Sequence, residues 1–162
     1  MVTLVAHDVV SLIPSFCDAF RGVNAGVEGG MMAWSKTDHT AYDYSVDSLM
    51  EVDRYLDAIR PIKDQVDWQV YTNTVLVTGA YIGEVLRRHG DKPWEWMNFS
   101  DFLQQHGDLA VALEISGEEL HVAAFLVADR SVTLPFNKVM RNLEEGPENS
   151  IHFYVTATGA GD

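Results

Sequence analysis

The stretch from Asp67 to His89 constrains the fold more than any other part of the chain. Apolar, small or amphipathic residues recur along it at steps of three and four, over about six helical turns: Trp68, Tyr71, Val75, Gly79, Ile82, Leu86 and His89. A second stripe of this kind contains Leu76, Ala80 and Gly83. Two stripes at this period indicate a helix that is apolar on most sides. The sequence therefore predicts one long central helix that buries most of its circumference.

Part of the same stretch also resembles a nucleotide-binding fingerprint. Thr78-Gly79 and Gly83 match the first half of the T-G-x-x-x-G-x-G pattern of short-chain dehydrogenases. That fold needs a third glycine, and Val85 stands in its place. The following segment, Lys92–Phe99, contains Trp and Pro and is not expected to be a second strand ending in an acidic ribose ligand. We therefore expect no nucleotide and no other cofactor.

The glycines in this stretch have a structural explanation instead. Each glycine inside a helix costs about 1 kcal/mol relative to alanine, and close packing of another element against Gly79 and Gly83 can offset that cost. The triplet His-Gly-Asp occurs at His89 and again at His106. Each is expected to end a helix with a left-handed glycine cap. Because helix ends explain both His-Asp pairs, no metal site is expected.

The remaining segments predict helices before the central helix and strands after it. Ser11–Phe20 is expected to form a short helix with Cys17 in the core, and Asp43–Ile62 a longer one with Ser45 as its N-cap. A further short helix is expected to begin at Ser100. After it, alternating apolar residues predict a hairpin over 109–115 and 119–128, a short strand at 131–134, a helix from 135 to 143 and a final strand over 150–158.

This order of elements predicts an α+β fold, with N-terminal helices and a long central helix packed on a C-terminal, mostly antiparallel β-sheet. We expect a single domain over residues 1–162. Within it, residues 1–44 are expected to be loop-rich, residues 45–107 helical, and residues 108–158 β-rich with one helix. No feature of the sequence predicts an oligomeric state or the order of residues 22–33.

Net charge is the strongest signal in the composition. Twenty-four acidic residues face eleven basic ones, for a net charge of −13. This charge would repel a phosphate backbone, so nucleic-acid binding is not expected, whereas it would attract a basic protein partner. The charge could equally serve solubility. No apolar run reaches the roughly 18 residues that span a bilayer and the N-terminus lacks a basic region, so we expect no membrane association and a cytoplasmic location.

Six residues of the second half of the central helix and the segment after it are candidates for a binding site. Glu84 can form an ion pair with Arg87 or Arg88, or it can face a ligand. Two tryptophans can anchor a partner or pack in the core. The six candidates are Tyr81, Glu84, Arg87, Arg88, Trp94 and Trp96. No catalytic residue is assigned, because the chain carries no G-x-S-x-G, H-E-x-x-H or Cys-His signature.

Several stretches together resemble a group of uncharacterised bacterial proteins. They are "DYSVDSLMEVDRYLDAIRP", "GAYIGEVLRRHG", Trp94 and "LPFNKVMRNLEEGPENSIHFY". That group shares a D-Y-S-x-x-S-L helix, a G-A-Y-x-G-E helix followed by a Trp, and a C-terminal P-F-x-x-V segment. The resemblance covers about Tyr42 to Tyr154 and implies no known reaction. Some similar small acidic proteins look like immunity or interaction modules of bacterial conflict systems.

We therefore expect a non-enzymatic protein-interaction module, immunity-like in its role. Two alternatives stay open. One is a small hydrolase that uses Glu84, Tyr81 and one of the six histidines. The other is a protein that binds a small ligand in a pocket between the central helix and the sheet, using Glu84 and nearby aromatic residues.

Overall fold

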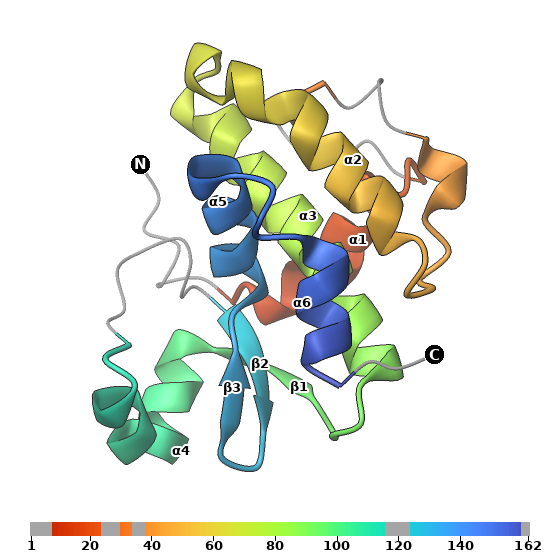
Figure 1. Ribbon diagram of the computed structural model, residues 1–162. Helices are drawn as coiled ribbons and strands as arrows, with labels where there is room; N and C mark the ends of the chain where they lie inside the picture. Colours follow the sequence, from red (N-terminus) through yellow and green to blue (C-terminus); the bar gives the residue numbers. More distant parts are fainter. Residues whose placement is uncertain (1–7, 24–29, 34–37, 116–123, 160–162) are drawn as a thin grey trace.

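The computed structural model describes residues 8–23, 30–33, 38–115 and 124–159. Within these ranges the chain forms six α-helices and a three-stranded antiparallel sheet (Figure 1). The α+β class and the packing of helices on an antiparallel sheet are confirmed. No helix in the described ranges is long and apolar enough to cross a membrane.

The elements follow one another in this order: η2 Val10–Leu12, α1 Ile13–Phe20, η4 His39–Ala41, α2 Leu49–Ile59, η5 Arg60–Gln65, α3 Trp68–His89, β1 Glu95–Asn98, α4 Phe99–Ala112, β2 Ala124–Ala128, β3 Ser131–Thr133, α5 Pro135–Glu145 and α6 Ile151–Ala157. The three short η elements are 3-10 helices that lead into or connect the longer ones.

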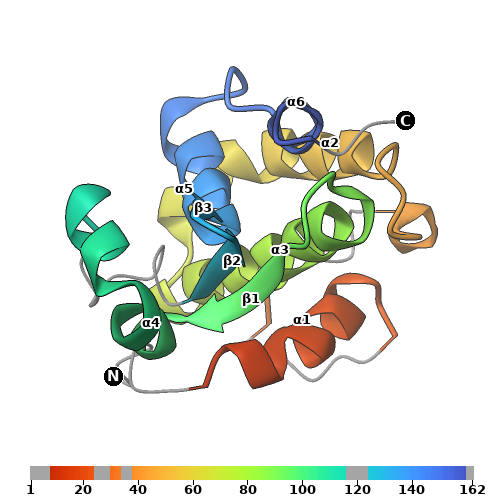
Figure 2. The same ribbon diagram turned by 90° about the horizontal axis from the view of Figure 1, so that it is seen from below.

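Helix α3 lies at the centre of the molecule, as the sequence predicts. Figure 2 shows α1 on one side of it and α2 and α6 on the opposite side. The helix begins where the Asp67 side chain accepts a hydrogen bond from the backbone N–H of Val70 at 2.9 Å. Every residue from Thr74 to Gly83 is buried. A helix with no exposed face over ten residues needs partners on all sides, and the surrounding helices provide them.

Neighbouring elements come closest to α3 at its two glycines. A Cβ atom at Gly79 would lie 2.3 Å from Cδ1 of Phe136 and 3.2 Å from its Cα. A Cβ atom at Gly83 would lie 2.2 Å from Cζ2 of Trp96 and 3.3 Å from Cγ of Pro135. The first residues of α5 and the side chain of Trp96 in β1 therefore press directly onto the helix backbone. The expected role of the glycines as sites of close packing is confirmed.

The sheet has the order β1-β2-β3 and both pairs are antiparallel. Trp96 of β1 pairs with Leu126 of β2, and Val127 pairs with Val132 of β3. Residues 95–98 form strand β1, but its antiparallel pairing with β2 differs from the parallel unit of a dinucleotide fold, in agreement with the expectation that this segment is not the second strand of such a fold. Every residue of β2 is buried, because the helical core covers one face and α4 covers the other.

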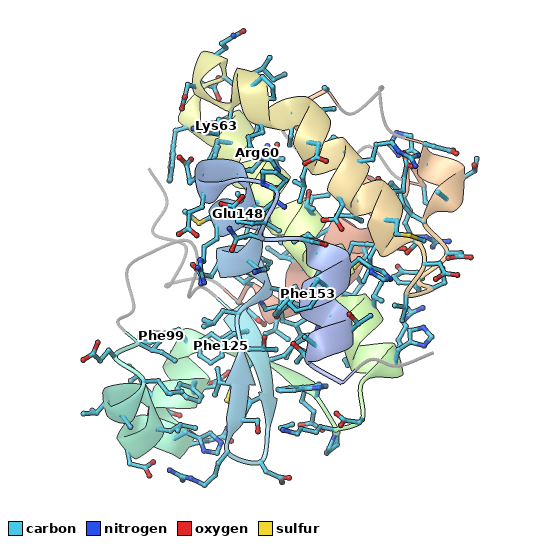
Figure 3. All side chains as sticks on the ribbon, viewed as in Figure 1. Arg60, Lys63, Phe99, Phe125, Glu148 and Phe153 are labelled. Carbon is cyan, nitrogen blue, oxygen red and sulfur yellow. The ribbon has the colours of Figure 1, made fainter. Side chains whose placement is uncertain are left out.

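A second, smaller hydrophobic cluster lies between the sheet and α4. Its centre is an edge-to-face contact between Phe102 of α4 and Phe125 of β2, whose rings are 4.8 Å apart. Phe99 packs against the same cluster, and Figure 3 shows Phe99 and Phe125 at this end of the molecule. This cluster explains why α4 does not end at His106. The helix has non-helical dihedrals there and then continues to Ala112, which places Leu109 against the sheet.

The expectation of a β-rich region over residues 108–158 is therefore wrong at two places. Residues 109–112 belong to α4, and residues 151–157 form α6 instead of a final strand. Ile151 and Val155 are buried and lie four positions apart, which suits one face of a helix. Phe153, between them, is 68% exposed. Residues 116–123, which include the expected hairpin turn, lie outside the described part of the chain.

A carboxylate from another helix fixes the start of α6. Asp53 of α2 accepts hydrogen bonds from Ser150 Oγ at 2.8 Å, from the backbone N–H of Ile151 at 2.6 Å and from that of His152 at 3.1 Å. The Ser150 side chain in turn accepts from the N–H of Phe153. These bonds satisfy N–H groups that the first turn of a helix leaves without partners.

Two expected helix caps also differ from the structure. Helix α2 begins at Leu49, and Ser45 lies one turn earlier, where its hydroxyl accepts from the N–H of Ser48. Gly90 follows α3 in an extended conformation, with φ −68° instead of a left-handed φ. A Cβ atom there would lie 2.7 Å from the carbonyl oxygen of Leu86 and 2.7 Å from Trp94, so the position is restricted by space.

We expect Gly83→Ala to destabilise the protein by about 1–3 kcal/mol, because the added methyl group overlaps the Trp96 ring. The ring cannot move away easily, since it stacks on Phe136 and donates a hydrogen bond to Glu84. Gly107→Ala in α4 is the matched control. Nothing lies within 4 Å of its Cβ position, so we expect a gain of up to about 1 kcal/mol. Chemical denaturation measures both, and equal effects would contradict the close-packing explanation.

Candidate functional site

The candidate site is organised around Glu84 in the last third of α3. Its carboxylate accepts hydrogen bonds from Arg87 Nε at 2.6 Å, from Arg87 Nη2 at 3.0 Å and from Trp96 Nε1 at 3.0 Å. Arg88 Nη2 lies 4.0 Å from the other side of the same carboxylate. The expected pairing of Glu84 with Arg87 or Arg88 is therefore present, and Trp96 adds a partner that sequence spacing could not reveal.

This arrangement keeps Glu84 ionised. Burial raises the pKa of Glu84, but the hydrogen bonds from Arg87 and Trp96 and the charges of both arginines outweigh it, so the pKa lies below its ordinary value. Both carboxylate oxygens are already bonded. A carboxylate with a lowered pKa and no free oxygen is a poor proton acceptor, so this site supports a structural role for Glu84 over a catalytic one.

Tyr81, one turn earlier on α3, supports a neighbouring residue instead of facing solvent. Its side chain is fully buried. Its hydroxyl oxygen accepts a hydrogen bond from the backbone N–H of Tyr44 at 3.0 Å and lies 2.6 Å from Ser48 Oγ. Burial raises the pKa of this phenol, which keeps it protonated. Tyr81 therefore holds the segment between η4 and α2 in place.

Tyr44 has an unusual backbone conformation at this point. Its φ is +66°, in the left-handed region that non-glycine residues seldom adopt. Three contacts hold it there: the Tyr81 hydroxyl at its N–H, His89 Nε2 at 2.8 Å from its carbonyl oxygen, and the Tyr81 ring, which stacks 5.2 Å from the Tyr44 ring. Strain that several contacts maintain is concentrated at functional sites in proteins.

Tyr44 forms one wall of a pocket between α1 and α3, which we call the Tyr44 pocket. Its volume is about 560 Å³, and it is lined by Pro14, Cys17, Asp18, Arg21, Tyr44, Glu84 and Arg88. Two guanidinium groups lie over the Tyr44 ring, with Arg88 Cζ 3.6 Å and Arg21 Cζ 4.7 Å from its centroid. Arg21 Nε also donates to the backbone oxygen of Tyr42 at 2.8 Å.

The pocket contains the single cysteine of the chain. Burial, reinforced by the nearby Glu84 charge, raises the pKa of Cys17 to about 12. The sulfur is therefore a neutral thiol at physiological pH. The residue is 2% exposed, so the prediction that Cys17 is a core residue is confirmed.

The other three candidates, Arg87, Trp94 and Trp96, line a different hollow of about 500 Å³ together with residues of η2 and β1. Trp94 is only 4% exposed, and the Trp96 ring stacks on Phe136 of α5 at 5.9 Å. Both tryptophans therefore pack against the core, which was the structural alternative for them. The structure brings Glu84 and Arg88 into the Tyr44 pocket and places Tyr81 behind it.

An exposed tryptophan lies at the opposite end of α3. Trp68 is 54% exposed and its ring stacks on Tyr71, with centroids 5.7 Å apart. It belongs to a groove of about 410 Å³, which we call the Trp68 groove, lined by Lys63, Asp64, Val66, Asp67, Trp68, Tyr71, Met140 and Glu144. The helical pattern predicts that Trp68 belongs to the buried stripe of α3, and this prediction is wrong because the side chain is exposed.

Acidic residues elsewhere are engaged in structural contacts. On α2, Asp53 holds the start of α6, Glu51 pairs with Arg54, and Asp57 pairs with Arg60. Within the residues that the structure describes, no group of three or more His, Cys, Asp or Glu side chains is arranged to hold a metal ion.

Comparisons with known proteins add no relative. No family model matches the chain, and no curated protein or solved structure matches it significantly. The resemblance to uncharacterised bacterial proteins therefore stays a prediction, and the site must be interpreted from its own geometry.

We expect Tyr81→Phe to destabilise the protein by about 1–3 kcal/mol, because it leaves the N–H of Tyr44 without its buried acceptor and removes one of the two hydrogen bonds of the Ser48 hydroxyl. Tyr71→Phe is the control, because its hydroxyl bonds Glu144, whose side chain is half exposed, and water can take over. Thermal or urea unfolding of both variants checks the prediction. A loss no larger than that of the control would contradict the supporting role of Tyr81.

Glu84→Gln tests the ionised state of the carboxylate. Because the folded pKa lies below its ordinary value of 4.5, ionised Glu84 stabilises the protein above that pH, and the contribution is lost as the pH falls through the folded pKa. We expect the stability difference between wild type and Glu84→Gln to be constant near neutral pH and to shrink below about pH 4.5. A difference that grows on acidification would contradict this assignment.

Proposed function

We propose that this chain is a non-enzymatic binding protein that docks a basic protein partner on the Trp68 groove. The observation that carries the proposal is the exposed Trp68 in a groove rimmed by carboxylates. Tryptophan is enriched among the residues that dominate interface energetics, and such anchors lie in pockets at the centre of an interface.

The groove offers such a partner both apolar and polar contacts. Trp68, Tyr71 and Met140 provide the apolar surface. The rim is already ordered, since the Tyr71 hydroxyl donates to Glu144 at 3.1 Å and Lys63 Nζ lies 3.1 Å from Asp64 and 3.1 Å from Glu144. A preformed groove of this kind reduces the entropy lost on binding.

Charge favours a basic occupant over an acidic one. Three carboxylates, those of Asp64, Asp67 and Glu144, line the groove with a single ammonium group, that of Lys63. The side chain of Asp64 is 86% exposed, so an incoming arginine or lysine can reach it beside its contact with Lys63. The net charge of −13 extends the same field over the molecule, which speeds the encounter with a positively charged surface.

The bonding of Glu84 supports binding over catalysis as the function. The hydrolase alternative relied on Glu84 as a reactive carboxylate, and both of its oxygens are bonded to Arg87 and Trp96. An immunity-like role is the specific form of the proposal. In that role the partner is a basic enzyme or toxin. The Trp68 groove covers a part of the partner's surface that the partner needs for its activity.

Affinity capture from the native host tests the proposal. We expect immobilised wild-type protein to retain one basic protein reproducibly, with binding that weakens as salt rises, because the contact is electrostatically steered. Trp68→Ala should weaken binding by about 2 kcal/mol or more, as expected for a central aromatic anchor. Titration of the identified partner with each variant measures the effect.

Phe153→Ala is the matched control for this experiment. Phe153 is an aromatic residue that is 68% exposed on α6, and Figure 3 shows it apart from Lys63 of the groove. It should leave binding unchanged. The groove is rejected as the docking surface if the partner still binds Trp68→Ala with wild-type affinity. It is also rejected if Phe153→Ala weakens binding as much as Trp68→Ala does. The reproducible absence of any retained protein would reject the interaction function itself.

A further inference from the structure

We propose that the Tyr44 pocket binds a small molecule through a carboxylate group, which the guanidinium groups of Arg21 and Arg88 hold. This site is independent of the Trp68 groove. Glu84 follows Trp68 by sixteen positions on one helix, which places the two sites about 24 Å apart along its axis.

Two positive charges lie close to the Tyr44 ring. The Cζ atoms of Arg21 and Arg88 both lie within 5 Å of the centroid of one ring, that of Tyr44. Two guanidinium groups around one partly buried ring repel each other, and the ring offsets only part of that repulsion. An anion bound to both would remove it.

The nearby carboxylates leave the positive charge of the pocket only partly balanced. Glu84 is 4.0 Å from Arg88 but only 2.6 Å from Arg87, which lies outside the pocket lining. Arg21 uses its Nε on the backbone oxygen of Tyr42, a neutral acceptor. Asp18 is the remaining charge in the lining. With Glu84 matched by Arg87, two guanidinium groups face one carboxylate, within a protein that is acidic overall.

The Tyr44 ring, on which both arginines pack, is held in a fixed position. The Tyr44 backbone is held in the left-handed region by Tyr81 and His89, and this conformation directs its ring under both guanidinium groups. Such strain is stabilised by the surrounding contacts and pre-organises the site. Ligand contacts made to pre-organised side chains cost less entropy than contacts made to mobile ones.

The lining favours a carboxylate over a phosphate. The planar fork of an arginine matches a carboxylate or a phosphate in two parallel hydrogen bonds, so the charge of the lining decides between them. Asp18 and Glu84 line the same pocket and would repel the double charge of a phosphate more than the single charge of a carboxylate. Pro14 and the neutral thiol of Cys17 give an apolar surface for the rest of the ligand, and the volume of about 560 Å³ is typical of small-molecule sites.

Titration of the wild-type protein with benzoate and acetate tests the proposal directly. Benzamide has the shape of benzoate without its charge, and inorganic phosphate provides the competing anion. We expect saturable binding of the carboxylates, with benzamide and phosphate weaker by about tenfold or more. In wild-type protein the Nε–H resonances of Arg21 and Arg88 should shift with the same saturation curve.

Arg21→Met and Arg88→Met should each weaken benzoate binding by about tenfold or more, because each removes one of the two charged donors. Arg130→Met is the matched control, since it removes an equal charge from an exposed pair with Asp108. The proposal is overturned if Arg130→Met weakens benzoate binding as much as the pocket variants do. It is also overturned if phosphate binds more tightly than benzoate, or if neither carboxylate binds saturably. If the pocket variants do not fold, the titration of the wild-type protein tests the proposal alone. Nε–H signals of Arg21 and Arg88 that do not shift on addition of benzoate would then overturn the proposal.

Discussion

The structure depends on the close approach of Phe136 and Trp96 to the backbone of α3 at Gly79 and Gly83. Because no side chain stands at these positions, the Trp96 ring lies close enough to the helix for its indole N–H to reach Glu84. Glu84 then binds Arg87 and lies near Arg88, whose guanidinium group covers the Tyr44 ring. Gly83 is thus linked, through Trp96 and Glu84, to the lining of the Tyr44 pocket.

The sequence could predict those parts of the fold whose pattern is long or local. Helix α3 repeats its apolar period over 22 residues, which few alternative structures accommodate, and the pairing of Glu84 follows from helical spacing alone. Residues 151–157 could not be predicted, because Ile151 and Val155 suit both an alternating strand and a short helix. The contact that selects the helix comes from Asp53, almost one hundred residues earlier. Strand β1 has only four residues and depends on its pairing with β2.

In the candidate sites, too, local patterns could be predicted and contacts between distant segments could not. Tyr81, Glu84 and Arg88 could be identified because they share one helix, but the pocket they support also needs Arg21 and Tyr44 from other segments. No local sequence pattern predicts the left-handed conformation of Tyr44, because hydrogen bonds to residues of α3 stabilise it. Trp68 was placed on the buried stripe of α3, yet the stripe reaches the surface at the first turn, where surrounding helices no longer cover it.

The Trp96 ring packs directly against the backbone of α3 at Gly83. A double-mutant cycle of Gly83→Ala with Trp96→Leu tests this contact, because leucine lacks the ring atoms that the new methyl group would meet. We predict that the cost of Gly83→Ala falls by about 1 kcal/mol or more when Trp96 is already replaced. Additive effects within about 0.5 kcal/mol would show that the two residues are not coupled and that Trp96 does not require a glycine at position 83.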